Sequence, residues 1–293
     1  MSKNYLSPDE IVDYTIQGGQ KKIKRTTMAV FLMAIMAGVY IALGALASST
    51  AAHGIANKGL SKLVTGAVFP VGLMFVVING ADLFTGNCLI FMSVLDKKVK
   101  CREIVKNLVV VLVGNFIGAV SIAFLEANSG IFQIGDNAFG AYVLKTAYGK
   151  VNLSFTQALS LAILCNIFVC AGVLLMYSAK DIAGKVLGGF FPIFAFAISG
   201  AEHVVANMYY IPAAIFAKGN EAFIEAAHLT NLQAETITWS RFLIQNVIPV
   251  TIGNIIGGLF VGGMYFAIFK KYANKPEETI EAVMALKERI SES

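Results

Sequence analysis

Two short stretches of similar sequence place polar side chains inside long apolar runs. Residues 80–88 read GADLFTGNC, and residues 200–208 read GAEHVVANM. Both begin with Gly-Ala-acid and continue with three further residues, a small residue and an asparagine. Acids, glycines and asparagines suit a lipid-facing helix poorly, because their polar groups would lack partners there. We therefore expect these two stretches, here called the cassettes, to build a functional site within the membrane.

His203, in the second cassette, is the strongest candidate for chemistry. It lies in an apolar stretch expected at mid-membrane depth, where an ionisable residue is functional by default. Burial favours the neutral imidazole, whereas a nearby anion favours the cation. His203 could therefore donate a hydrogen bond or a proton to a small passing anion. The alternative is a buried histidine with a purely structural role.

Thr85 and two acids are further polar groups of the cassettes. Thr85 is expected to face His203 from the other half, and its hydroxyl can donate or accept a hydrogen bond; the alternative is a bond to its own helix backbone. Asp82 and Glu202 each precede a predicted helix start, where a carboxylate can cap free N–H groups. We predict that both acids are structural. Four asparagines are expected to support the loops, with Asn254 also a candidate for the pore wall: Asn87, Asn115, Asn207 and Asn254.

Basic and bulky residues flank the cassettes. Lys150 lies just before the fourth apolar run, where it would attract anions at the extracellular mouth or serve as an ordinary interfacial lysine. Bulky apolar side chains near the cassettes could form dry constrictions that admit only small, weakly hydrated or neutral species, or could simply pack as core. These residues are Phe69, Leu73, Leu83, Phe84 and Phe196.

The composition indicates which elements hold these residues. Of the 293 residues, 57% are hydrophobic and 14% are charged, against about a quarter charged in average soluble chains. The chain is therefore predicted to be an all-α integral membrane protein. Six apolar runs are long enough to cross a hydrocarbon core of about 30 Å: residues 27–48, 62–95, 104–127, 155–178, 186–217 and 241–269. The second and fifth are too long for one crossing and hold the cassettes, so we expect broken helices there.

The order of motifs predicts an inverted repeat. The third run contains GNFIG at 114–118, and the sixth contains GNIIG at 253–257. Each half therefore reads as a span, a cassette span and a GNxIG span. Because three crossings is an odd number, the halves have opposite orientations in the membrane, a 3+3 inverted repeat. The glycines four apart are also typical of close helix packing.

The termini and the basic residues predict the orientation. Ser7, Pro8 and Glu10 form a helix start, and an amphipathic helix should follow and end at Gly18-Gly19. Most of the 23 Lys and Arg residues lie in segments that share a side with the N-terminus, which makes both termini cytoplasmic. We thus expect one transmembrane channel domain over 1–293, a cytoplasmic N-terminal amphipathic helix within 1–25 and a cytoplasmic tail over 271–293, helical after Pro276. The net charge of +5 is concentrated beside the membrane and gives no nucleic-acid signal.

Four motifs together resemble one family. They are GADLFTGN at 80–87, NIFVCAG at 166–172, SGAEHVVANMYYIP at 199–212 and IPVTIGNIIGG at 248–258. This combination resembles the formate/nitrite transporter family over essentially the whole chain. Within that family, the sequence as a whole is most similar to the hydrosulfide-channel branch.

The resemblance implies an aquaporin-like protomer, a homopentamer in the cell (inner) membrane, and passage of formate, nitrite and hydrosulfide, with hydrosulfide the expected anion. It implies a central pair of Thr85 and His203 and an outer basic position at Lys150. It places Leu83 and Phe84 on the broken-helix loop and Asn254 at the pore side. The constriction positions that it implies are Phe69, Leu73 and Phe196. It implies no cofactor.

Other functions remain open at this point. The same residues suit an anion channel with His203 as a proton relay or an obligate proton–anion symporter. A water or neutral-solute channel would share the inverted repeat, but the chain has no NPA tripeptide. A membrane enzyme is disfavoured, because the sequence contains neither HExxH nor GxSxG. Its three histidines are not expected to form a metal cluster, since His53 and His228 are expected in separate extracellular loops.

Overall fold

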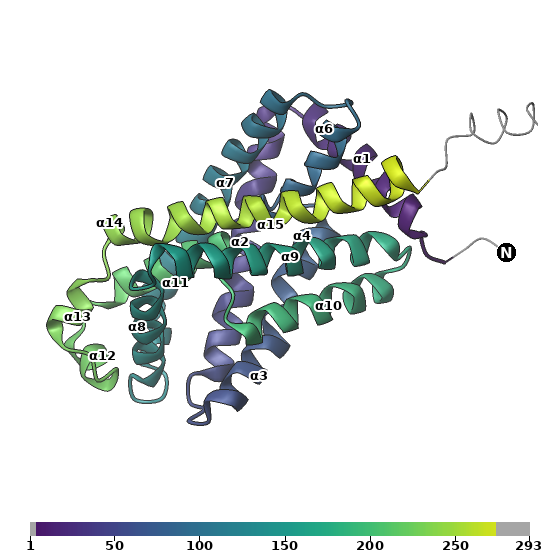
Figure 1. The fold of residues 1–293 in the computed structure, drawn as a ribbon. Coiled ribbons are helices and arrows are strands. Elements are labelled where there is room, and N and C mark those ends of the chain that lie inside the picture. The colour runs from purple at the N-terminus through teal and green to yellow at the C-terminus, as the bar shows by residue number, and fades with distance from the viewer. Residues whose placement is uncertain (1–3, 274–293) are drawn as a thin grey trace, which may run out of the picture.

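A computed structural model describes residues 4–273 of the chain. The regular secondary structure of these residues is helical, apart from an isolated bridge between Tyr5 and Ala179 (Figure 1). The first half contains α1 (Pro8–Lys24), α2 (Thr27–Ala52), α3 (Lys58–Val68), α4 (Val71–Asn79), α5 (Phe84–Asn87), η1 (Cys88–Ile90), α6 (Phe91–Leu95), α7 (Cys101–Ala127) and η2 (Ile131–Gln133). The second half contains α8 (Ala138–Val151), α9 (Phe155–Ser178), α10 (Ile182–Ser199), α11 (Val204–Ala217), α12 (Glu221–Ala226), α13 (Asn231–Glu235), α14 (Trp239–Arg241), η3 (Phe242–Val247), α15 (Ile248–Phe266) and η4 (Ala267–Tyr272). The predicted helix after Pro276 lies outside the described residues.

The six predicted spans are present. Six helical segments of residues 4–273 are long and apolar enough to cross a membrane, namely Thr27–Ala52, Lys58–Asn79, Cys101–Ala127, Phe155–Ser178, Ile182–Ser199 and Trp239–Tyr272. The second and fifth spans are broken as predicted. α4 and α10 each end at a glycine in the left-handed conformation, Gly80 with φ 81° and Gly200 with φ 72°. Glycine adopts this conformation without a steric cost. Shorter helices then begin at Phe84 and Val204.

The two halves use their glycines in the same way. α2 packs along α7, and α9 packs along α15. A Cβ atom on Gly118 of α7 would lie 2.0 Å from the Ile35 carbonyl oxygen of α2. A Cβ atom on Gly257 of α15 would lie 2.4 Å from the Ile163 carbonyl oxygen of α9. The GNxIG motifs therefore let two pairs of helix backbones touch, which confirms that the repeat extends to packing.

Helix α1 is longer than predicted. The Ser7–Glu10 capping box forms as expected. The helix continues through Gly18-Gly19 to Lys24, so the predicted helix end at the two glycines is wrong. Gly19 instead serves packing, because a Cβ atom there would lie 2.2 Å from the Ser93 hydroxyl oxygen. That hydroxyl donates a hydrogen bond to the Ile16 carbonyl. The glycine thus allows α1 to rest directly on the segment after the first cassette.

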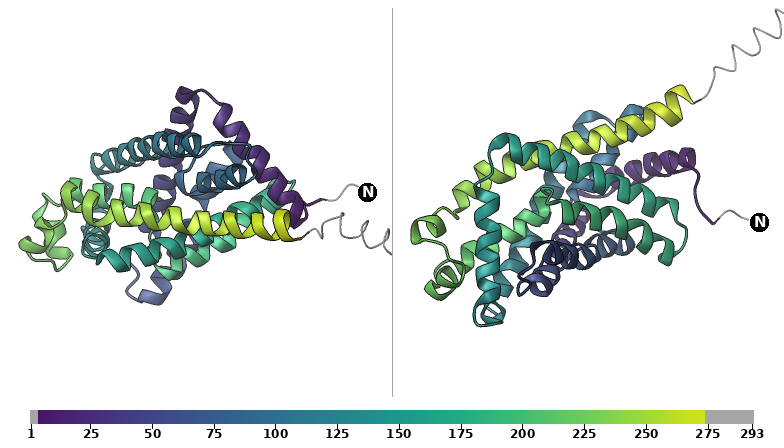
Figure 2. Two further views of the ribbon diagram at one scale, coloured as in Figure 1. Left: turned by 45° about the horizontal axis from the view of Figure 1, so that its top comes forward. Right: turned by 60° about the horizontal axis from the view of Figure 1, so that its bottom comes forward.

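Helix α8, which was not predicted, is the counterpart of α1 in the second half. Lys22 of α1 lies four residues before Thr26, the N-cap of α2, and Lys150 of α8 lies four residues before Ser154, the N-cap of α9. Figures 1 and 2 show α1 and α8 at opposite ends of the molecule, as an inverted repeat requires. The repeated unit is therefore a short helix followed by three spans.

Candidate functional site

The cassette backbones are held by an asparagine from each GNxIG motif. Asn115 of α7 accepts from the Phe84 amide at 2.9 Å and donates to the carbonyls of Ala34 and Asp82. Asn254 of α15 accepts from the Val204 amide at 3.0 Å and donates to the carbonyls of Ala162 and Glu202. Both asparagines are fully buried. Each one closes the gap between two half-helices by satisfying backbone groups that would otherwise be unpaired in the membrane.

The cassette acids do not cap the half-helices, so that prediction is wrong. The first free amide of each half-helix donates its hydrogen bond to Asn115 or Asn254. The two carboxylates form ion pairs instead. Asp82, fully buried, contacts the Lys22 ammonium at 2.8 Å and the Arg25 guanidinium at 3.1 Å. Glu202 contacts the Lys150 ammonium at 2.8 Å. Each acid is thus linked to the short helix that precedes the spans of its own half.

The cassette asparagines make a second pair of matched contacts. The Asn87 amide donates to Asn107 at 2.9 Å, and the Asn207 amide donates to Asn246 at 2.8 Å. Asn207 also donates to Glu202, and Lys22 donates to Asn87. Asn107 and Asn246 were not predicted as site residues, although each lies eight residues before the asparagine of a GNxIG motif. That common spacing is the signal that would have identified them.

His203 and Thr85 meet between the two halves. The Thr85 hydroxyl lies 2.9 Å from His203 Nε2, and both side chains are buried. The Ala206 amide donates to His203 Nδ1 at 3.1 Å, so the imidazole is also the N-cap of α11. A backbone N–H only donates, so Nδ1 is the acceptor, and neutral His203 carries its proton on Nε2. That proton is directed at Thr85.

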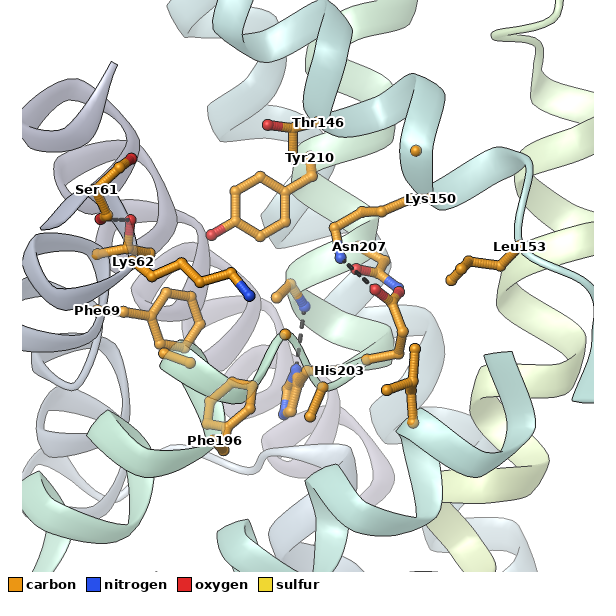
Figure 3. A pocket seen from close by; sticks show the side chains of 18 of the residues that line it. Ser61, Lys62, Phe69, Thr146, Lys150, Leu153, Phe196, His203, Asn207 and Tyr210 are labelled. Carbon is orange, nitrogen blue, oxygen red and sulfur yellow. Dashed lines mark hydrogen bonds and ion pairs between the residues drawn. The ribbon is translucent and has the colours of Figure 1, made fainter. Parts of the chain in front are cut away.

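A cavity of about 510 Å³ opens above His203 (Figure 3). Its walls include Phe69, Lys150, Phe196, Glu202 and Asn207, all predicted site residues. Phe69 and Phe196 make an edge-to-face contact at 5.4 Å between ring centroids, and the Phe196 ring lies 6.0 Å from the His203 ring. These three rings form an aromatic layer at the cavity floor.

A second cavity, of about 220 Å³, lies at the other end of the site. Leu73, Leu83 and Asn87 line it together with Lys22 and Arg25. The two cavities share no lining residue. Leu83 and His203 occupy equivalent positions, each as the residue before a half-helix, and they face opposite cavities. Of the other predicted residues, Phe84, Thr85, Asp82 and Asn254 are buried and line neither cavity.

Lys62 of α3 lines the larger cavity, and sequence reasoning missed it. Its ammonium extends into the cavity beside Phe69 in Figure 3. None of the acids within residues 4–273 forms an ion pair with Lys62. Lys150 lies 5.3 Å from the centroid of the Tyr210 ring, another missed wall residue. Two cations and the carboxylate of Glu202 thus surround this cavity, which makes its electrostatic potential favourable for anions.

Comparison with known proteins points to one family. The model of the family described as "Formate/nitrite transporter" matches residues 9–268. A probable formate transporter of Methanothermobacter thermautotrophicus is 40% identical over 290 residues, covering 92% of this chain and 100% of the relative. The formate channel FocA of Escherichia coli (strain K12) is 35% identical over 269 residues, covering 90% of this chain and 94% of the relative. Among solved structures, a pentameric formate channel with formate bound is 33% identical with a TM-score of 0.74, covering 84% of this chain and 98% of that one.

These similarities extend over the spans, both cassettes and both GNxIG motifs. They identify a multi-pass membrane transport protein rather than an enzyme, as the sequence predicted. The chain belongs to the formate/nitrite transporter family.

Proposed function

We propose that the chain conducts small monovalent anions of weak acids through the membrane, between the two cavities and past His203. The observation that carries this proposal is the Thr85–His203 hydrogen bond of 2.9 Å, buried between two cavities that each contain basic side chains. Small anions collect in the cavities because cations outnumber carboxylates on both walls. The apolar residues between the cavities then exclude hydrated ions.

The narrow part of the pathway lies between the two cavities. Phe69 and Phe196 bound it on one side, and Leu73 and Leu83 bound it on the other. A bare charge in such a constriction costs at least several kcal/mol. The Nε2–H group of His203 lowers that cost by donating a hydrogen bond to the anion. In a proton relay the ring must first take up a second proton; the imidazolium then gives one proton to the anion, a neutral acid passes and the neutral imidazole is restored. Phe84 and Asn254 support this segment from behind, and Lys150 draws anions to the larger cavity.

Formate is the anion that the relatives favour, since their names describe formate transporters and channels. Hydrosulfide, the anion expected from the sequence, and nitrite remain candidates for the same pathway. The test is flux into proteoliposomes with the three anions compared side by side at equal gradients. Formate flux above that of empty liposomes is expected, and absence of flux with all three anions would overturn the proposal.

An anion channel and an obligate proton–anion symporter use the same residues differently. Simultaneous measurement of anion current and proton movement, at several voltages and pH values, distinguishes the two mechanisms. Anion current without proton movement excludes the symporter. His203→Ala with unchanged flux and unchanged pH dependence would remove the imidazole from the mechanism.

The assembly proposed for the chain is a homopentamer with one pathway per protomer. The solved relative described as a pentameric formate channel supports it. The expected native mass is about five times the chain mass of 31.3 kDa, and a monomer in native mass spectrometry would contradict the assembly. The distribution of Lys and Arg supports cytoplasmic N- and C-termini in the cell (inner) membrane.

Helix α1 is positioned to control the smaller cavity. Tyr14, Lys21 and Lys22 of α1 line that cavity, and Lys22 pairs with Asp82 of the first cassette. Displacement of α1 would therefore open this mouth and release the acid. Deletion of residues 1–20 should alter the pH dependence of flux, and an unchanged profile would exclude a gating role.

A further inference from the structure

A groove on the outer surface lies between the N-terminal parts of α2 and α7. Its polar end, of about 140 Å³, is lined by Lys22, Arg25, Glu103, Lys106 and Asn107. Its apolar end, of about 550 Å³, is lined by Met28, Phe31, Val109 and Val113. Thr27 and Val110 line both ends, so the groove is continuous. The function proposed above uses neither Lys106 nor the apolar end.

The polar end has an excess of positive charge. Lys106 is exposed and has no ion pair with any acid of the described residues. Arg25 uses one guanidinium nitrogen on Asp82, and a guanidinium has further N–H donors. Glu103 is the acid at the rim, and its carboxylate accepts from the Lys100 amide at 2.7 Å. Among residues 4–273, the carboxylates of Asp82 and Glu103 are thus the acids at these three cations, Lys22, Arg25 and Lys106.

Asn107 supplies an independent indication of a ligand. Its side chain is 6% exposed, and its carbonyl oxygen accepts from Asn87. Its amide nitrogen donates no hydrogen bond within residues 4–273. The equivalent nitrogen of Asn246 donates to the Lys150 carbonyl at 3.3 Å and to Glu202 at 3.4 Å. The second half therefore satisfies this donor internally, whereas the first half leaves it at the groove, where it is available to a ligand.

The apolar end continues along the spans from this polar end. Met28, Val109 and Val113 are 65%, 57% and 48% exposed. A phospholipid at a membrane interface has the same order, a charged headgroup followed by an acyl chain along the spans. A second copy of this chain would instead have to bring a carboxylate to the polar end to balance its positive charge.

We propose that this groove binds one anionic phospholipid per chain, with the phosphate on Arg25, Lys106 and Asn107 and one acyl chain along Met28, Phe31, Val109 and Val113. Basic pockets between transmembrane helices recognise anionic headgroups in this way. The excess positive charge selects an anionic lipid over a zwitterionic one, whose own ammonium group would approach Lys106.

The headgroup part is tested by native mass spectrometry of the full-length protein released from vesicles. Vesicles contain phosphatidylglycerol or phosphatidylcholine with identical acyl chains. Lys106→Gln should lower retention of phosphatidylglycerol about fivefold, the effect of one cation near the surface, without changing retention of phosphatidylcholine. Lys98→Gln is the matched control, because Lys98 is exposed on the same side and lies outside the groove. Equal retention of both lipids, or an equal loss in both variants, would overturn the proposal.

The acyl-chain part is tested on α7 itself. Val109→Trp fills the groove and should reduce phosphatidylglycerol retention, whereas Val105→Trp should not, since Val105 is similarly exposed (60% against 57%) but lies outside the groove. A benzophenone photo-crosslinker placed at position 109 should label phosphatidylglycerol. Crosslinking to a second copy of the chain instead would assign the groove to a subunit interface and overturn the lipid site. These readouts do not depend on transport.

Discussion

The two ring nitrogens of His203 have separate partners, and this determines what the residue can do. Nδ1 accepts from the Ala206 amide, and Nε2 faces Thr85. Addition of a second proton at Nδ1 would break the cap of α11, so the site favours the neutral ring with its proton on Nε2. The Nε2 proton of this neutral ring is the one available for hydrogen bonding, and proton transfer from His203 would require a second proton on the ring first.

The Thr85 hydroxyl should therefore matter for both flux and stability. Thr85→Val removes the acceptor for the buried Nε2–H group, which costs about 1–3 kcal/mol. Formate flux in proteoliposomes should fall about tenfold, the effect of ~1.4 kcal/mol, and Tm should decrease. Thr85→Ser keeps the hydroxyl and should retain most of the flux. Equal flux in Thr85→Val and the unmodified protein would show that the contact is structural only.

Lys62 should act on anion entry rather than on the constriction. Its ammonium extends into the larger cavity (Figure 3) and pairs with no acid of the described residues. Lys62→Gln should lower the initial rate of formate uptake at about 0.01 M salt, where the Debye length is about 30 Å, by roughly two- to fivefold, and much less at about 1 M salt. Lys58→Gln, an exposed lysine outside the cavity, is the control. A salt-independent loss in Lys62→Gln would argue against attraction.

At the scale of elements, Asn115 and Asn254 hold the two broken helices. Each joins three backbone groups from two different segments. Asn115→Ala leaves the Phe84 amide and two carbonyls without hydrogen-bond partners inside the membrane. Each unpaired group lowers the free energy of unfolding by about 1–3 kcal/mol, so Tm should fall severely. Asn128→Ala, at the exposed end of the same helix, should change the free energy of unfolding by no more than about 0.5 kcal/mol. Similar Tm values for the two variants would contradict this role of Asn115.

The close helix contacts within each half depend on glycines, which have no side chain at the point of contact. Gly118→Ala places a Cβ atom 2.0 Å from a backbone oxygen of α2, so α2 and α7 must separate and Tm should fall. Gly149→Ala in α8 meets nothing within 4 Å and should raise stability by roughly 0.5–1 kcal/mol through helix propensity. Thermal unfolding of the Gly118→Ala and Gly149→Ala proteins, compared by Tm, tests both expectations. A Gly118→Ala protein as stable as Gly149→Ala would refute the close packing.

At the scale of the whole molecule, the sequence predicted the features that depend on local composition or on the internal repeat. Apolar length predicted the six spans, and the cassettes predicted the two breaks and the meeting of Thr85 with His203. Helix α8 was missed because fourteen residues without a strong apolar face give no span signal. The partners of Asp82 and Glu202 were missed because Lys22 and Lys150 reach them from distant segments. Lys62 was missed because its place on the cavity wall depends on how α3 packs.

The equivalence of α1 and α8 has a consequence for rectification. Each mouth has a cassette carboxylate with a lysine ammonium 2.8 Å away, and each has at least one further cation on its wall. The charges at the two entrances are therefore similar, and we expect no strong rectification of anion flow. Under the proposed function, influx and efflux of formate under equal and opposite gradients should have similar initial rates in proteoliposomes. The sign of the gradient across the membrane, rather than the architecture of the pore, would then set the direction of net flow.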